Sequence, residues 1–339
     1  MSRCHSCLTD SKSFYCKKCQ KELFDGIPVD KLDFTPDDMS PAEETSYREG
    51  LSISGVQRKF SFAFDDRKKL VQVEKKGRYI LKPIPNEKYT LIEDMPANEH
   101  LSMQIAKQVF KLNIAVNGLI LMENDELAYI TKRFDYNKQG EKIDQEDFAA
   151  LTNSTEETRG KKFKYEYSLQ ECASHVIDKY TTAPLIVKTD FFKKVLFDYL
   201  ICNGDSHLKN FSLYHPDIKA SDKYVMTPYY DILNSRMHLG SKEDGDIALE
   251  LFADGESTHV FDAVGFHTNF DFETLGDVIG LNKKVVEKTF TAFEKSMPKI
   301  EQMIERSFLS DDGKESYFKL LKDRMDRRIL YRPDFLDNI

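Results

Sequence analysis

The chain has 339 residues, of which 40% are hydrophobic, enough apolar side chain for roughly two globular lobes with their own cores. Its formal net charge of −8 excludes a mainly electrostatic grip on nucleic acid, which needs a basic surface to displace counterions from phosphates. No apolar run approaches the roughly 20 residues that span a bilayer, and cysteines stand where a signal peptide would be apolar. The composition therefore predicts a cytoplasmic protein with no membrane contact, which would reach DNA only through a partner.

Four of the six cysteines lie within the first nineteen residues and form two Cys-x-x-Cys pairs. The four are Cys4, Cys7, Cys16 and Cys19. Such pairs are typical of a tetrahedral thiolate site for structural Zn²⁺, so residues 1–24 are predicted to form a zinc knuckle. Only eight residues separate the pairs, which is short for a zinc ribbon, and free or redox-active thiols remain the alternative. Cys172 and Cys202 are expected to be small buried hydrophobes.

An acidic, proline-containing segment at residues 25–50 is predicted to be a linker. Beyond it, short runs with β propensity predict a β-rich N-lobe over residues 51–134, with one amphipathic helix at 97–110 inserted between the strands. The predicted strands are 60–64, 70–73, 79–81, 118–122 and 127–131.

Residues 135–339 are predicted to form a helical C-lobe. An apolar stripe that begins at Phe191 runs to a helix stop at Asn203-Gly204, and further helices are predicted at 169–180, 275–293 and 317–328. The predicted fold class is therefore α+β, bilobal and protein-kinase-like, with the small cysteine segment in front. Unrelated chains share this order of lobes, so the functional assignment depends on particular residues.

Phosphoryl transfer needs an oriented base, metal ligands and a cation on the phosphates. After the apolar helix, Asp205 and Asn210 stand five residues apart, which is the spacing between the base and the magnesium-binding Asn of a kinase catalytic loop. Asp231 follows a short predicted strand, where kinases place the carboxylate that holds the metal. Further catalytic candidates in the loop are His207 and Lys209. The sequence thus offers one base and two Mg²⁺ ligands.

Lys82 ends an apolar β run, as does the kinase lysine that contacts the α- and β-phosphates of ATP. Seventeen residues later, Glu99 opens the amphipathic helix and is a candidate partner for Lys82. The predicted adenine-binding crossing between the lobes contains Lys132, Arg133 and Phe134. Each residue alone has an ordinary interpretation, such as a solvated strand end for Lys82 or a favourable first-turn charge for Glu99. Their joint order and spacing favour an ATP and Mg²⁺ site.

Five segments together resemble the HipA family of bacterial toxin kinases. They are residues 51–59, 98–100, 132–135, 203–212 and 230–231, and the resemblance covers about residues 51–251. It implies an ATP-dependent protein serine/threonine kinase in which Asp205 is the base, Asn210 and Asp231 bind Mg²⁺ and Lys82 contacts ATP. It also implies a phosphate-covering loop with an autophosphorylated serine. The loop residues are Ser52, Ser54, Gly55, Val56 and Gln57, and either serine is a candidate for the modification.

Longer HipA proteins carry an additional N-terminal subdomain, whereas only 51 residues precede Ser52 here. In this respect the chain resembles the short HipT-like branch of three-component toxin–antitoxin systems. That resemblance implies a HipB-like DNA-binding antitoxin and a small HipS-like protein as partners. It also implies that the phosphorylated substrate is a translation component such as an aminoacyl-tRNA synthetase.

Two other functions fit parts of the sequence. The run Gly204-Asp205-Ser206-His207 is similar to the start of a dinuclear site in a metal-dependent phosphoesterase, but the remaining histidines do not supply the further ligands. A catalytically silent kinase-like binding module, with the cysteines as a DNA-binding finger, is disfavoured by the complete catalytic set and the acidic charge.

Overall fold

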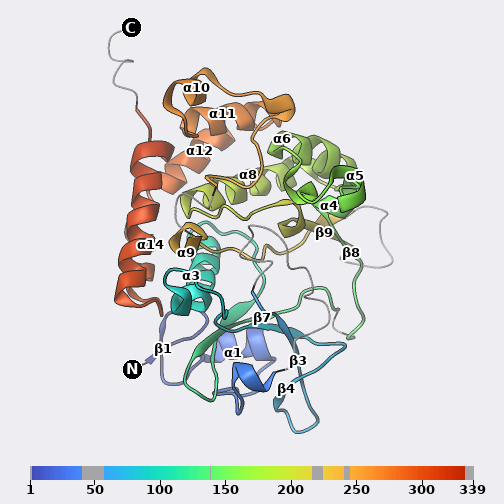
Figure 1. The fold of residues 1–339 in the computed structure, drawn as a ribbon, viewed down its shortest axis with the longest axis vertical. Helices are drawn as coiled ribbons and strands as arrows, with labels where there is room; N and C mark the ends of the chain where they lie inside the picture. Colours follow the sequence, from blue (N-terminus) through green and yellow to red (C-terminus); the bar gives the residue numbers. More distant parts are fainter. Residues whose placement is uncertain (1, 40–56, 138, 216–223, 240–244, 333–339) are drawn as a thin grey trace. The chain divides into compact units, whose positions relative to one another are not determined.

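The computed structural model describes residues 2–39, 57–137, 139–215, 224–239 and 245–332 (Figure 1). The chain folds into two compact units. Unit 1 consists of Met1–Lys142, Pro228–Asp244 and Lys299–Tyr317, and unit 2 consists of Ile143–Thr227, Gly245–Pro298 and Phe318–Ile339. Within the described part of the chain, no helix has both the length and the apolar character needed to cross a membrane.

Unit 1 is built on a five-stranded antiparallel sheet with the order β4-β3-β5-β7-β6. The strands are β3 (Phe60–Phe64), β4 (Leu70–Gln72), β5 (Tyr79–Lys82), β6 (Asn117–Leu121) and β7 (Leu127–Lys132). Each lies within one residue of its predicted bounds, because short runs rich in aromatic and aliphatic side chains, bounded by polar and turn residues, mark the strands. The five predicted strands are confirmed.

The predicted inserted helix is α3 (Met95–Gln108), preceded by the short η3 (Ile92–Asp94). It packs on β6 and β7, and Pro96 occupies its first turn, where a missing N–H costs nothing. The prediction of a one-sided amphipathic helix was wrong, since all residues from Met95 to Ala106 are buried. Polar side chains of α3 bond to other segments of unit 1, so its orientation is fixed on several sides.

The N-terminal segment shares the hydrophobic core of the sheet. It contains the hairpin of β1 (Ser2–Arg3) and β2 (Asp10–Ser11), followed by α1 (Lys17–Phe24). Tyr15, Leu23 and Phe24 belong to one apolar cluster with strand residues such as Phe62 and Ile130. After η1 (Pro36–Asp38), Met39 joins the same cluster. Unit 1 also contains the segment that begins at Pro228 and includes α9 (Arg236–Leu239), and residues 299–317, which lie in and between α13 (Met297–Glu305) and α14 (Asp311–Arg324).

Unit 2 is mainly helical. Its longest helix, α8 (Pro184–Leu200), buries the predicted apolar stripe, including Phe191, Leu196 and Leu200. The helix predicted at 169–180 consists of α6 (Leu169–Glu171), a π-helical turn (Cys172–Ile177) and α7 (Asp178–Tyr180). Further elements are α4 (Phe148–Leu151), α5 (Glu156–Arg159), η4 (Phe163–Tyr165), η6 (Leu208–Asn210), η7 (Ala253–Gly255), α10 (His259–Val264) and a second π-helical turn (Met325–Ile329).

Two features of unit 2 differ from the sequence prediction. The stretch predicted as one helical run at 275–293 is two helices, α11 (Asn269–Val278) and α12 (Lys283–Glu294). They separate at Gly280, whose φ of 81° suits glycine and ends the first helix. Residues 225–226 form a strand, as predicted. The three-stranded sheet to which this strand belongs, β10-β9-β8, was not foreseen because its strands are short and partly polar. They are β8 (Gln145–Asp147), β9 (Ser212–Tyr214) and β10 (Val225–Met226).

Candidate active site

Lys82 stands at the end of β5, an inner strand of the unit 1 sheet. Tyr79 and Leu81 belong to the core shared with the N-terminal segment, and alternation turns Lys82 to the opposite face. Its cross-strand partner is Tyr129, whose ring centroid lies 5.4 Å from Nζ. Only 3% of Lys82 is exposed. A buried ammonium is tolerated only beside anionic partners, and two carboxylates supply them.

The first partner is Glu99, in the first two turns of α3. Lys82 Nζ donates to Glu99 Oε1 at 2.6 Å, and both side chains are buried. This confirms the pairing predicted from the seventeen-residue spacing. In kinases a lysine and a helix glutamate paired in this way must both be in place before the phosphates are held correctly.

The second partner is Asp231, which accepts a hydrogen bond from Lys82 Nζ and another, at 3.2 Å, from Lys59 Nζ. The φ of Asp231 is 53°, a left-handed conformation that aspartate tolerates better than most residues and that clusters at functional sites. Sequence analysis missed the role of Lys59, although it closes the first motif shared with the HipA family. Asp231 lies 149 residues from Lys82 and 172 residues from Lys59 in the chain. Contacts at such separations leave no local pattern in the sequence.

The charges of this cluster are strongly coupled. Burial opposes the charge of Asp231, yet Lys59 and Lys82 hold its pKa well below the usual range. Burial likewise opposes the charge of Lys82, but Asp231 and Glu99 raise its pKa above the usual value. Burial raises the pKa of Glu99 to about 7 despite Lys82. The result is an ionised carboxylate beside two ammonium groups, a donor set that suits a divalent cation and a polyphosphate.

Asn98 fixes the segment that carries Asp231. Its side-chain amide donates to the carbonyl of Asn234 at 2.9 Å and accepts from the N–H of the same residue, also at 2.9 Å. Its Nδ2 also lies 2.8 Å from Nε2 of His238. Asn98 and Glu99 are neighbours in α3, so this helix carries one carboxylate of the cluster and binds the segment that carries the other, Asp231. Sequence analysis did not foresee this arrangement.

In unit 2, the loop after α8 presents Asp205, which is almost fully buried. Asn210 Nδ2 donates to the backbone carbonyl of Asp205 at 2.7 Å, and Tyr165 OH donates to Asp205 Oδ1 at 3.2 Å. His207 Nε2 lies 3.7 Å from the same Oδ1. The loop therefore brings three of its four predicted residues together, whereas Lys209 is exposed. Tyr165 is a contact that sequence analysis missed.

A buried ion pair supports this loop from α8. Lys194 pairs with Asp198, four residues along the helix, and each is no more than 2% exposed. Asp198 also accepts from Ser206 Oγ at 2.6 Å and from Asn203 Nδ2 at 3.0 Å. Both donors flank Asp205 within the loop. The pair thus anchors the loop to the helix. Sequence analysis did not predict it, because the apolar residues of α8 dominate the pattern.

In the predicted adenine-binding segment, all three side chains contact other residues. Lys132 pairs with Asp25 at 2.6 Å, Arg133 makes a two-pronged bond with Asp135, and the ring of Phe134 lies 5.7 Å from that of Tyr230. Lys132 lies opposite Tyr79, about three strand residues, or roughly 10 Å, from Lys82. Of the predicted phosphate-covering loop, Gln57 is buried, whereas Ser52, Ser54, Gly55 and Val56 lie outside the described residues.

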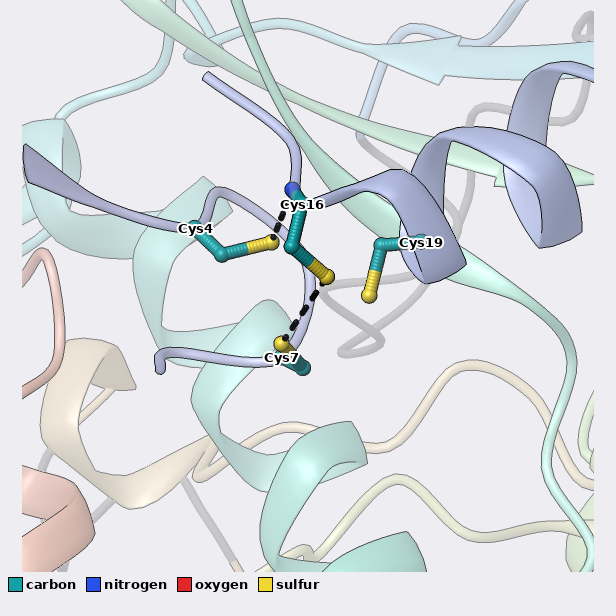
Figure 2. Close-up of side chains that lie close together, drawn as sticks. All are labelled: Cys4, Cys7, Cys16 and Cys19. Carbon is teal, nitrogen blue, oxygen red and sulfur yellow. Dashed lines mark hydrogen bonds between the residues drawn. The ribbon is translucent and has the colours of Figure 1, made fainter. Parts of the chain in front are cut away.

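The four N-terminal cysteines form a candidate metal centre in unit 1, and Figure 2 shows their sulfurs turned toward one another. The four sulfurs lie within 4.8 Å of one another. Within the described residues, the carboxylates and histidines around Asp205 do not gather into a comparable cluster of three ligands, as a dinuclear phosphoesterase would need. Cys172 and Cys202 are fully buried in unit 2, as predicted.

The chain is similar to several known proteins. "Putative kinase" of Haemophilus influenzae is 29% identical over 297 residues, which cover 82% of each chain. "Putative kinase Y4dM" of Sinorhizobium fredii is 29% identical over 219 residues, covering 59% of this chain and 50% of that protein. The Shewanella oneidensis HipA, solved in complex with HipB and its operator DNA, aligns with a TM-score of 0.62 at 22% identity, over 89% of this chain and 70% of that chain.

The Helicobacter pylori proinflammatory kinase CtkA aligns with a TM-score of 0.52 at 16% identity, over 80% of this chain and 91% of that chain. At such identities the two solved structures establish the fold, which confirms the predicted α+β, kinase-like class. A family model described as HipA-like C-terminal domain matches residues 51–300, well over half of the chain. The chain therefore belongs to the HipA-like family, as its motifs predicted.

Proposed function

We propose that this chain is an ATP-dependent protein serine/threonine kinase. The observation that carries the proposal is the buried cluster in which Lys82 bonds to both Glu99 and Asp231. A lysine on an inner strand, paired with a helix glutamate and beside an ionised aspartate, is the set of charges that phosphoryl transfer requires. The relatives named as kinases support the same activity.

In this proposal the residues of unit 1 bind and orient the nucleotide. Lys82 contacts the phosphates and Glu99 holds Lys82 in place, while Lys59 supplies a second cation. Asp231 and Asn210 are proposed as Mg²⁺ ligands from the family resemblance, and their oxygen atoms are the donor type that this ion prefers. These residues would hold Mg²⁺, which would supply positive charge to offset the negative charge of the phosphates. The covering loop includes Ser54, Gly55, Val56 and Gln57, and the adenine-binding backbone is that of Lys132, Arg133 and Phe134.

Asp205 is proposed as the base that accepts the proton of the substrate hydroxyl. The hydroxyl of Tyr165 and the amide of Asn210 orient it through the bonds described above. His207 lies beside its carboxylate and, together with Lys209, completes the set of proposed catalytic residues. Asp205 is fixed by its neighbours and therefore does not need to reorganise when substrate arrives.

We further propose that the protein is the toxin of a bacterial toxin–antitoxin system of the short HipT-like type. The Shewanella relative in complex with HipB and operator DNA supports a HipB-like antitoxin as partner, and the net charge of −8 fits DNA contact through that partner. A small HipS-like protein, a translation component such as an aminoacyl-tRNA synthetase as substrate, and autophosphorylation at Ser52 or Ser54 follow from the sequence resemblance. The proposed ion of the four-cysteine centre is a structural Zn²⁺.

The activity is tested by incubating the purified full chain with γ-labelled ATP, Mg²⁺ and a bacterial lysate, and following label on protein serine and threonine. Asp205→Asn should lower transfer by about 10²- to 10⁴-fold, the usual contribution of a general base. The matched control is Asp277→Asn, an exposed position of α11 in the same unit, which should transfer at the wild-type rate. Equal transfer by Asp205→Asn and wild type would refute the proposed role of Asp205, and no transfer by wild type would refute the kinase assignment.

A further inference from the structure

The four cysteines have the geometry of a closed thiolate metal site. Zinc–sulfur bonds of about 2.3 Å in a tetrahedron place sulfurs roughly 3.8 Å apart, and Cys7 Sγ lies 3.9 Å from Cys16 Sγ. The backbone N–H of Cys16 donates to Cys4 Sγ at 3.3 Å (Figure 2). Cys4 and Cys19 are buried and Cys7 and Cys16 are partly buried. Four thiolates so close together suit one soft divalent cation and leave no ligand position open to substrate.

The cysteine segment covers the outer edge of the sheet. β6 is an edge strand of the five-stranded sheet, and edge strands need their free N–H and C=O groups covered. Leu119 N–H donates to the carbonyl of His5 at 2.8 Å, and Tyr15 OH donates to the carbonyl of Leu119 at 2.6 Å. Gly118 permits this close approach, because a Cβ there would lie 3.1 Å from the carbonyl oxygen of His5.

The same segment reaches α3 through the turn between Cys4 and Cys7. The carbonyl of Ser6 lies 2.8 Å from His100 Nε2, and the carbonyl of Cys7 accepts from Gln108 Nε2 at 3.0 Å. Both acceptors therefore belong to a Cys-x-x-Cys turn whose two ends are candidate metal ligands. A metal that fixes this turn also fixes the places of the two carbonyls against the helix.

We propose that Zn²⁺ bound by the four cysteines positions α3, and through it holds Glu99 against Lys82, so that metal occupancy sets the affinity for ATP. His100, the residue after Glu99, is the positioning residue, since its bond to Ser6 limits rotation of the helix. The consequence for ATP rests on the proposed function, because the Lys82–Glu99 pair matters for ATP only in a nucleotide-binding protein. Each thiol loses its proton on binding the metal, so loading releases up to four protons per chain.

The metal-dependent part is tested on the full chain by elemental analysis and hydrogen exchange. The isolated protein should contain about one zinc per chain. Removal of zinc with a chelator should accelerate exchange in β6 and α3 on the order of tenfold, leave α12 of unit 2 unchanged, and be reversed by Zn²⁺ but not by Mg²⁺. A chain without zinc, or one whose α3 exchanges equally with and without metal, would overturn the proposal.

Variants of the positioning residue separate metal binding from its effect. His100→Phe should keep one zinc per chain, exchange faster in α3 and bind ATP more weakly, whereas His100→Gln should approach wild type because the amide can still donate to Ser6. The matched control is His175→Phe, which removes the hydrogen bond of His175 with Tyr167 in unit 2 and should leave α3 unchanged. If α3 in His100→Phe matches wild type, the positioning role is wrong. Zinc content and exchange are measured without ATP, so they stand or fall independently of kinase activity.

Discussion

The charged cluster of unit 1 and the Asp205 loop of unit 2 are assembled in different ways. In unit 1, Lys59, Lys82, Glu99 and Asp231 form a cluster of charges joined across 17 to 172 residues of chain. In unit 2, hydrogen bonds between the Asp205 loop and α8 join residues only 5 to 12 apart, and Tyr165 adds a bond from 40 residues away. The first region depends on tertiary folding and on charge balance, whereas the second depends mainly on the local chain.

This difference determines how each region should respond to mutation. The loop of unit 2 contains few charges but is anchored to one buried ion pair, so loss of a single partner leaves the other charge buried without a counter-charge. The cluster of unit 1 shares its charge among four groups, so removal of Glu99 alone changes a balance that also depends on pH.

The largest expected effect on stability is in unit 2. Lys194→Met should lower the free energy of unfolding by about 3–5 kcal/mol, since Asp198 would remain as a buried unpaired carboxylate. Lys193→Met is the matched control, because Lys193 pairs with Asp190 at 3.1 Å on the helix surface, where such pairs contribute about 0–1 kcal/mol. Urea denaturation followed by circular dichroism measures both.

The double variant Lys194→Met/Asp198→Leu sharpens this prediction. It removes both charges and should recover part of the stability that Lys194→Met loses. If Lys194→Met and Lys193→Met were equally stable, the pair would not anchor the loop and the contrast between the regions would be lost.

A smaller, pH-dependent effect is expected in unit 1. Burial raises the pKa of Glu99 to about 7 in the folded protein, above the value of about 4.3 in an unfolded chain. Between these values the folded state binds more protons than the unfolded state, so this group makes stability fall as pH rises. Glu99→Gln removes this titration. The free energy of unfolding of Glu99→Gln minus that of wild type should therefore increase by about 2 kcal/mol from pH 5 to pH 8. Asp231 titrates well below this window and does not alter the slope.

Urea denaturation at pH 5, 6, 7 and 8 checks this expectation, with Glu126→Gln, an exposed position, as the control. The control should run parallel to wild type at every pH. A difference between Glu99→Gln and wild type that is constant with pH would mean that Glu99 is ionised throughout the range.

Sequence reasoning predicted the parts of the molecule that local patterns encode. The strands of unit 1 and α3 lie within one or two residues of their expected bounds, and the order of Lys82 and Glu99 gave their pairing correctly. Lys59 was missed because its partner lies 172 residues away, and Lys194 was missed because an apolar helix hides a buried ion pair. The small sheet of unit 2 was missed because strands such as Gln145–Asp147 have no apolar alternation.

The assignment of separate tasks to the two regions is tested most directly by calorimetric titration of the full chain with ATP, with and without Mg²⁺. Asp231→Asn should weaken Mg²⁺-dependent ATP binding at least about tenfold, because a proposed metal ligand is lost. Asp205→Asn should bind Mg²⁺ and ATP within about threefold of wild type, because a general base acts on the substrate proton and not on nucleotide affinity. Unchanged ATP binding by Asp231→Asn, or equal losses in both variants, would contradict the account.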